Sequence, residues 1–82
     1  MAWMFEVYYA WPVDLRREER IVEAAAKHSG EQTFREVPTA DSIMQTVVLT
    51  LEFKELADAE AAASELIQLG EHVENISDYG DD

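Results

Sequence analysis

The sequence predicts an α+β fold in which two helices pack on one side of an antiparallel sheet. Two observations support this prediction. A strand-like run, Met4–Trp11, precedes a helical pattern that ends at Gly30, and a second strand-like run, Met44–Phe53, precedes a helical pattern that ends at Gly70. Each of these glycines is followed by Glu and a further strand-like stretch. The chain therefore reads strand, helix, strand twice over.

The first strand-like run alternates between two sets of side chains. Trp3, Phe5, Val7, Tyr9 and Trp11 point one way, and Met4, Glu6, Tyr8 and Ala10 point the other. Pro12 ends the strand because proline cannot donate a ladder hydrogen bond, and Asp14 is expected to cap the first helix. The inner face of that helix is expected to carry Leu15, Ile21, Val22, Ala25 and Ala26. Gly30 is expected to end it in a left-handed conformation.

The second half of the chain repeats this order, and its strand patterns differ in how strongly they predict a buried strand. Glu31–Val37 is polar, which favours an edge strand, whereas the β-branched run over 44–53 favours a central one. Asp58 is expected to cap the second helix. Its inner stripe is expected to be Ala59, Ala62, Ala63, Leu66, Ile67 and Leu69. In the last strand, about His72–Ser77, the apolar residues stand three apart, so we expect a bulge or an early end.

Two strand–helix–strand units in series resemble the ferredoxin-like α/β plait, and the resemblance covers essentially the whole chain. Right-handed crossovers put both helices of such a plait on one face of its sheet. We therefore expect one ferredoxin-like domain over residues 1–77, with strands in the order 4-1-3-2, and an acidic C-terminal tail over residues 78–82. A fold that hosts many unrelated functions does not by itself assign one.

The chain is strongly acidic, with a net charge of −12 over 82 residues. Charge of this sign repels phosphate groups and anionic lipids, so we expect neither nucleic acid nor membrane as a partner. There is no cysteine and the two histidines lack metal-ligand spacing, so we expect no metal and no cofactor. Glu6 interrupts the apolar N-terminal run, which is interpreted as a strand rather than a signal peptide, and a cytoplasmic location is expected.

One face of the sheet is expected to be open, and alternation predicts its residues. They are Met4, Glu6, Tyr8, Met44, Thr46, Val48 and Thr50, among which Glu6 alone is charged. An extended apolar sheet face is typical of an interface. We therefore expect a homodimer that forms through Met4, Tyr8, Met44, Thr46, Val48 and Thr50. The alternative is an ordinary solvent-facing surface, which antiparallel sheets tolerate.

A possible ligand site is expected where the first strand meets the first helix, at Trp11, Arg16, Arg17 and Glu18. The arginines suit a carboxylate or phosphate, or else they form surface ion pairs. Glu18 falls within the apolar stripe of the helix. It is either a desolvated carboxylate with a raised pKa, which would suit a proton shuttle, or a first-turn residue past the end of the sheet, in water or favoured by the helix dipole.

No constellation of catalytic residues stands out in the sequence. We expect a small non-enzymatic interaction or regulatory module that associates with itself through the open sheet face. One alternative is a sensor of amino acids or anions that resembles ACT domains, which share this fold. Another is a dimeric α/β-barrel enzyme with a pocket around Glu6, Tyr8 and Met44 between paired sheets. A last alternative is an acidic decoy that mimics nucleic acid or neutralises a basic toxin.

Overall fold

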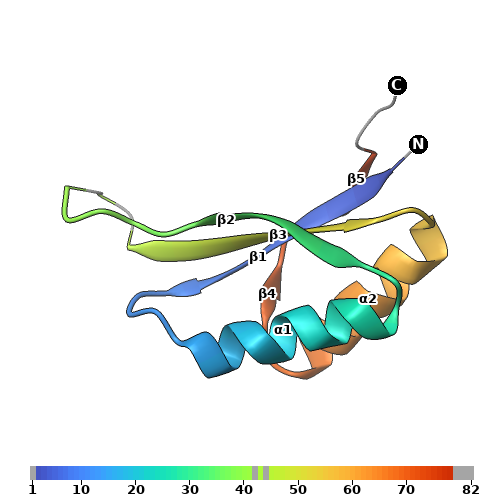
Figure 1. Cartoon of the computed structure of the whole chain (residues 1–82), viewed down its shortest axis with the longest axis horizontal. Helices are drawn as coiled ribbons and strands as arrows, with labels where there is room; N and C mark the ends of the chain where they lie inside the picture. Colours follow the sequence, from blue (N-terminus) through green and yellow to red (C-terminus); the bar gives the residue numbers. More distant parts are fainter. Residues whose placement is uncertain (1, 42, 44, 79–82) are drawn as a thin grey trace.

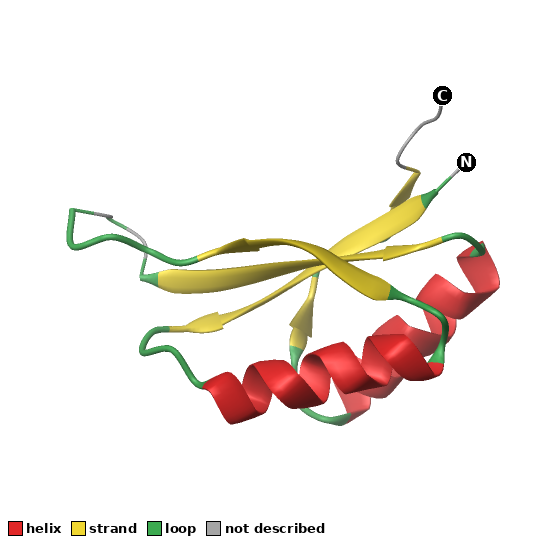
Figure 2. Cartoon of the chain, in the orientation of Figure 1, coloured by secondary structure: helices red, strands yellow, loops and turns green. Residues whose placement is uncertain are grey.

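The computed structural model describes residues 2–41, 43 and 45–78. In chain order its elements are β1 (Trp3–Ala10), α1 (Leu15–Lys27), β2 (Glu31–Glu36), β3 (Thr46–Phe53), α2 (Leu56–Gln68), β4 (His72–Val73) and β5 (Ser77–Asp78). Both helices lie on one side of the sheet (Figures 1 and 2). Neither helix has the length and apolar character that crossing a bilayer would require within the described residues. The predicted order of strands and helices is confirmed.

The strands are antiparallel neighbours in the order β2-β3-β1-β4, which is the predicted order 4-1-3-2 of a ferredoxin-like plait. The central pair, β1 and β3, is hydrogen-bonded over its whole length, from Trp3 opposite Phe53 to Ala10 opposite Thr46. The predicted irregularity of the last strand is also present, because β4 and β5 are two short strands that both pair with β1. Of the expected acidic tail, residues 79–82 lie outside the described residues.

The core lies between the sheet and the two helices. Its fully buried large side chains are Phe5, Val7, Ile21, Val47, Leu49, Leu51, Phe53 and Leu66. The rings of Phe5 and Phe53 stack with their centroids 5.4 Å apart. Most of the helical side chains that face these rings are alanines, so the helices approach the sheet closely and the aromatic rings fill the space between them.

The first helix begins as predicted, but its inner face is different. The side chain of Asp14 accepts a hydrogen bond from the backbone N–H of Arg17 at 3.1 Å, which confirms the cap. Leu15 is 69% exposed, and Ala26 is exposed as well, so the expectation that both face inward is wrong. Glu18 takes the inward place instead, because β1 and β2 supply it with hydrogen-bond partners.

Gly30, in the turn after α1, is needed because there is no room for a side chain. It is not needed for an unusual backbone conformation. Ser29 adopts the left-handed conformation, with φ of 65°, so the expectation that Gly30 would do so is wrong. A Cβ atom on Gly30 would lie 2.2 Å from Cε2 of Phe53. Because Phe53 is buried and stacked on Phe5, its ring cannot easily move aside. Any side chain at position 30 would therefore disturb the core.

The second helix also departs from the prediction at both ends. It begins at Leu56, and its N-cap residue Glu55 makes no side-chain hydrogen bond to it, so Asp58 lies in the first turn and is not the cap. A carboxylate in the first turn is nonetheless favoured by the helix dipole. The buried stripe ends at Leu66, whereas Ile67 and Leu69 are more than half exposed, so the prediction that both face inward is wrong.

A β-bulge in β2 decides which of its side chains face the helices. The register against β3 shifts between Gln32, which is opposite Leu51, and Phe34, which is opposite Thr50. Paired residues of neighbouring strands point to the same face of a sheet. The extra residue therefore turns Phe34 away from the helices and turns Arg35 toward them. The bulge therefore places Arg35 near the helices and leaves Phe34 on the other face of the sheet.

Candidate functional site

Three polar side chains from β1, α1 and β2 meet under the helices. The Tyr9 hydroxyl donates to Oε2 of Glu18 at 2.5 Å. Arg35 donates from Nε to Oε1 of Glu18 at 2.6 Å and from Nη2 to Oε2 at 3.1 Å. Glu18 is only 6% exposed. Both of its carboxylate oxygens are thus occupied by donors that belong to the protein itself.

The charges of this cluster explain how a buried carboxylate is tolerated. The hydrogen bonds from Arg35 hold the pKa of Glu18 below its usual value, although burial alone would raise it. Burial raises the pKa of Tyr9, which stays neutral and donates its proton to the carboxylate. The expectation of a raised pKa is therefore wrong, and so is the expectation that Glu18 lies in water. Its expected place in the first turn of the helix, where the helix dipole favours a carboxylate, is confirmed.

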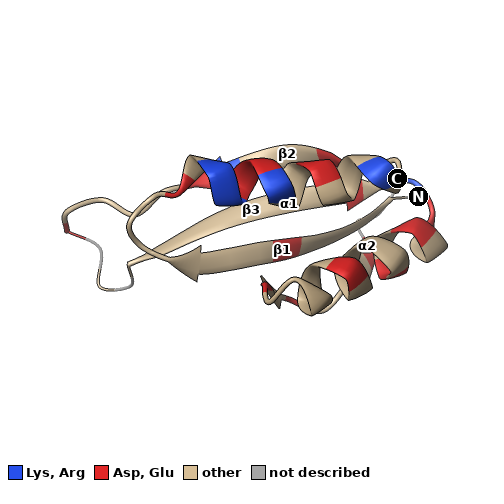
Figure 3. Cartoon of the chain, turned by 90° about the horizontal axis from the view of Figure 1, so that it is seen from below, with Lys and Arg blue, Asp and Glu red and all other residues tan. Residues whose placement is uncertain are grey.

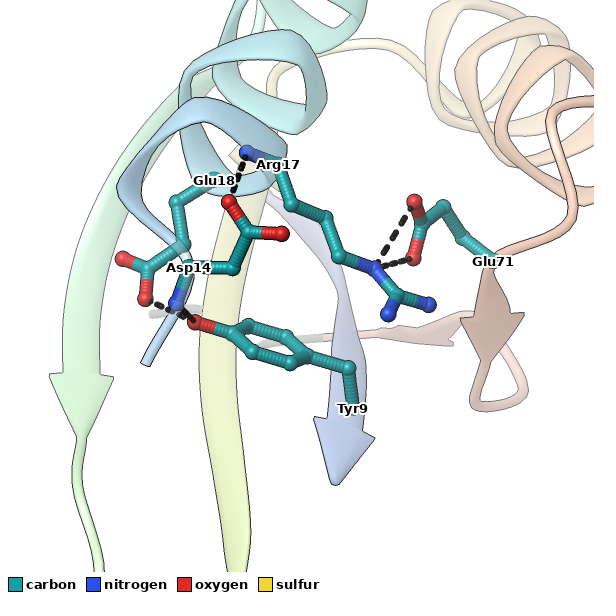
Figure 4. A network of polar contacts seen from close by, with 5 residues as sticks. All are labelled: Tyr9, Asp14, Arg17, Glu18 and Glu71. Carbon is teal, nitrogen blue, oxygen red and sulfur yellow. Dashed lines mark hydrogen bonds and ion pairs between the residues drawn. The ribbon is translucent and has the colours of Figure 1, made fainter. Parts of the chain in front are cut away.

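Arg17 extends this polar cluster toward β4, as Figure 4 shows. Its Nε atom donates to the two carboxylate oxygens of Glu71 at 2.9 and 3.2 Å. Its guanidinium carbon lies 4.9 Å from the centre of the Tyr9 ring, and the backbone N–H of Asp14 donates to the Tyr9 hydroxyl at 2.9 Å. The cluster therefore joins the ends of β1 and α1 to the segment that leads into β4.

The residues of the expected ligand site do not share one environment. Arg17 and Glu18 are both engaged within the polar cluster. Arg16 is exposed, and Trp11 is 46% exposed. The two charged side chains that would hold a small ligand therefore already hold other parts of the protein. A ligand site at these residues stays a prediction.

The opposite side of the sheet carries the expected interface residues. Met4, Tyr8, Thr46 and Val48 are partly exposed there, and Tyr8 lies directly opposite Val48. Thr50 is on the same face but only 7% exposed, since it lies between Glu6 and Phe34 on its neighbouring strands. Met44 lies outside the described residues.

This open face also carries residues that the sequence did not assign to it. Phe34 lies beside Thr50 and is 58% exposed. Glu36 lies beside Val48, and Glu52 lies opposite Met4. The expectation that Glu6 is its only charged residue is therefore wrong. The place of Glu52 on the open face could have been predicted by continuing the alternation of β3. The places of Phe34 and Glu36 could not, because they depend on the bulge in β2.

Two adjoining hollows mark the open face. The first has a volume of about 420 Å³ and is lined by Glu6, Tyr8, Thr46, Val48 and Glu74. The second, of about 710 Å³, shares Thr46 and Val48 with it and extends under the connection between β2 and β3. That connection projects beyond the rest of the sheet (Figure 1), and Ile43 within it is 97% exposed.

Basic residues lie elsewhere on the protein. Figure 3 shows that Lys and Arg gather on α1. The two that are not on this helix are Arg35, which faces the helix side, and Lys54, which follows β3. The described strands therefore present no Lys or Arg on the open face. Across the same part of the chain, no group of three or more His, Asp or Glu side chains is placed to hold a metal ion.

No protein-family model matches the sequence, and no curated protein is similar to it at a significant level. Functional inference therefore depends on the polar cluster and the open face.

Proposed function

We propose that this protein is a non-enzymatic interaction module that binds another polypeptide chain through its open sheet face. The observation that carries this proposal is an uncovered sheet face with an apolar and aromatic centre. Among the described residues, no helix or strand covers Phe34, Val48 and Tyr8, and Phe34 is more than half exposed. Exposed aromatic side chains of this kind are typical anchors of protein interfaces.

The sheet offers these anchors in a fixed arrangement. Tyr8 and Val48 stand on the two central strands, which are paired over eight positions each. His72 on β4 stacks on Tyr8 with the ring centroids 5.5 Å apart. A partner therefore meets side chains that are already positioned, which lowers the ordering cost of binding.

The polar cluster supports a structural role for the opposite side of the sheet. Perturbed pKa values often mark catalytic groups. Here, however, the perturbed carboxylate of Glu18 is held ionised by Arg35 and has no free oxygen to offer a substrate. An ACT-like site would also need Arg17, which Glu71 engages. These contacts favour an interaction module over an enzyme or a small-molecule sensor.

A second copy of the chain is a less suitable occupant of the open face. Stacking two such faces about a two-fold axis would enclose Glu6, Glu36 and Glu52 of both copies in one interface, with no Lys or Arg from the described strands on either face to pair with them. Like charges at a desolvated interface disfavour association. Dimerisation through this face stays a prediction that solution mass tests. Light scattering would give 9.3 kDa for a monomer and twice that mass for a dimer.

The test of the proposal is a selection of random peptides displayed on phage. Peptides selected on the wild-type protein would be measured against Val48→Lys, which alters the centre of the open face. The matched control is Ala61→Lys, which adds the same charge on the exposed side of α2. We expect selected peptides to lose roughly tenfold or more in affinity for Val48→Lys, because a long charged side chain would replace the apolar centre on which they pack, and to keep their affinity for Ala61→Lys.

Nuclear magnetic resonance would locate the bound peptides independently. Backbone shifts should change along β1 and β3 at open-face positions, and a monomeric solution mass would exclude competition by self-association. The proposal is wrong if no peptide is enriched. It is also wrong if the enriched peptides bind equally to both lysine variants and shift only helix residues.

A further inference from the structure

We infer that the partner is a basic polypeptide segment, and that an arginine side chain of this segment binds in the hollow between Glu6 and Glu74. This inference depends on the proposed function, because it specifies the chemistry of the chain that the open face binds. Some carboxylates of the protein are already neutralised by its own cations, and others are not.

On the helix side, three buried or half-buried acidic side chains have cationic partners. Glu18 is paired with Arg35, and Glu71 is paired with Arg17. Glu65 is paired with Lys27 at 2.6 Å and also contacts His28. These pairs use three of the six Lys and Arg side chains of an acidic chain.

On the open face, the carboxylates around Tyr8 have no such partners. No Lys or Arg of the described chain lies within ion-pair distance of Glu6, Glu36 or Glu74. At the far end of the face a cation is close to the acidic residues, because Lys54 lines a hollow together with Glu31 and Glu52. The carboxylates that border the apolar centre at Tyr8 and Val48 therefore have no Lys or Arg beside them among the described residues.

The two carboxylates of the first hollow begin from neighbouring points of the backbone. Glu6 and Tyr8 are two residues apart on β1 and so point to the same face. The backbone N–H of Glu74 donates to the carbonyl oxygen of Glu6 at 2.8 Å, which keeps Glu74 beside β1. Glu6 and Glu74 then both line one hollow, whose other lining residues are Tyr8, Thr46 and Val48.

An arginine side chain fits both parts of this hollow. Its aliphatic stem would lie on Val48 and the Tyr8 ring, as long cationic side chains do on apolar surfaces. Its planar guanidinium carries enough donors to reach two carboxylates at once, which a lysine ammonium does with less geometric selectivity. A calcium ion, in contrast, needs six or more oxygen ligands and gains nothing from an apolar wall.

The net charge of the whole molecule also favours a basic partner. A chain with net charge −12 attracts a basic segment and repels an acidic one. Because five of the six Lys and Arg side chains lie on α1 or, as Arg35 does, face it, the attraction is strongest for a partner that approaches the open face. Electrostatic steering of this kind raises the association rate and weakens as salt is added.

The test uses the peptides selected on the open face. We expect them to be enriched in arginine, and we expect Glu6→Gln combined with Glu74→Gln to weaken their binding by roughly tenfold. The matched control is Glu23→Gln combined with Glu60→Gln, which removes the same charge from exposed helix positions and should change affinity less than about twofold. Thermal unfolding of each variant confirms that it is folded.

A peptide in which arginine is replaced by citrulline, which has the same shape without the charge, completes a double-mutant cycle. The loss of affinity caused by citrulline and the loss caused by Glu6→Gln with Glu74→Gln should not add, because both changes remove the same ion pair. Additive losses, or open-face binding by peptides without basic residues, would overturn this inference and leave the interaction module standing. Failure to find any peptide sensitive to Val48→Lys would instead overturn the proposed function.

Discussion

Glu18 on the helix side of the sheet and Glu6 and Glu74 on its open side differ in whether a cation of the protein pairs with them. On the helix side, Glu18 gives both carboxylate oxygens to Arg35 and Tyr9 and is almost completely buried. On the open side, Glu6 and Glu74 line a hollow and have no cationic partner within the described chain. A buried carboxylate must be paired for the fold to form, whereas an exposed one is solvated by water. The paired acid therefore serves stability, and the unpaired acids remain free for binding.

The two sides of the sheet also differ in how deeply neighbouring residues of β3 are buried. Leu49 is fully buried against the helices, and Val48 beside it is partly exposed. We expect Leu49→Ala to lower the free energy of unfolding by about 2–5 kcal/mol, because it removes buried methyl groups and leaves a cavity. Val48→Thr, which keeps the β-branched shape, should cost less than about 1 kcal/mol. Urea denaturation measures both, and similar losses would contradict the assignment of the two faces.

Substitutions on α2 test how closely the helix covers the sheet. Ala63 is buried and Ala61 is exposed. We expect Ala63→Leu to cost about 1–3 kcal/mol of unfolding free energy, because added methyl groups overpack a filled core. Ala61→Leu should leave that free energy nearly unchanged. Chemical denaturation of the two variants provides the comparison, and equal effects would mean that the helix does not present this face to the sheet.

The paired and unpaired acids can be compared by the same substitution. Glu18→Gln removes the charge that neutralises Arg35, and we expect a loss of about 1–2 kcal/mol, limited because the Arg35 side chain is one-third exposed. Glu6→Gln should leave stability unchanged or raise it slightly, since it removes negative charge from an acidic protein. Thermal unfolding near pH 7 measures both. A larger loss for Glu6→Gln would reverse the assignment of the two faces.

The stability contributed by Glu18 should depend on pH. Its pKa in the folded protein lies below its value in the unfolded chain, which is about 4.3. The contribution is therefore fully present above that value and is lost as pH falls through the folded pKa. The difference in unfolding free energy between wild type and Glu18→Gln should be constant between about pH 6 and 8 and shrink at lower pH. A difference that grows on acidification would contradict the ion pair.

The parts of the fold that follow from periodicity were predictable from the sequence. The strand order, the central pair and the face that carries Tyr8 and Val48 all follow from alternation and from the strand–helix–strand spacing. The errors at Leu15, Ile67 and Leu69 lie near helix ends, where the helical pattern continues but these side chains are not covered by the sheet.

The chemistry of the candidate site was less predictable, because it depends on one extra residue. Nothing in the sequence of β2 marks the bulge that turns Arg35 under Glu18 and Phe34 onto the open face. Without the bulge, alternation would place Gln32 and Phe34 on the same side. Long-range pairs such as Arg17 with Glu71 are likewise brought together only by the docking of β4 on β1.

The contact between Gly30 and Phe53 has a consequence for recognising relatives of this protein. Because a Cβ atom at position 30 would lie only 2.2 Å from the edge of the Phe53 ring, the two positions should vary together in related sequences. A relative with a side chain at position 30 would need a smaller residue than phenylalanine at position 53. This dependency, together with a strand–helix–strand order repeated every forty residues, gives a search criterion that does not require overall sequence similarity.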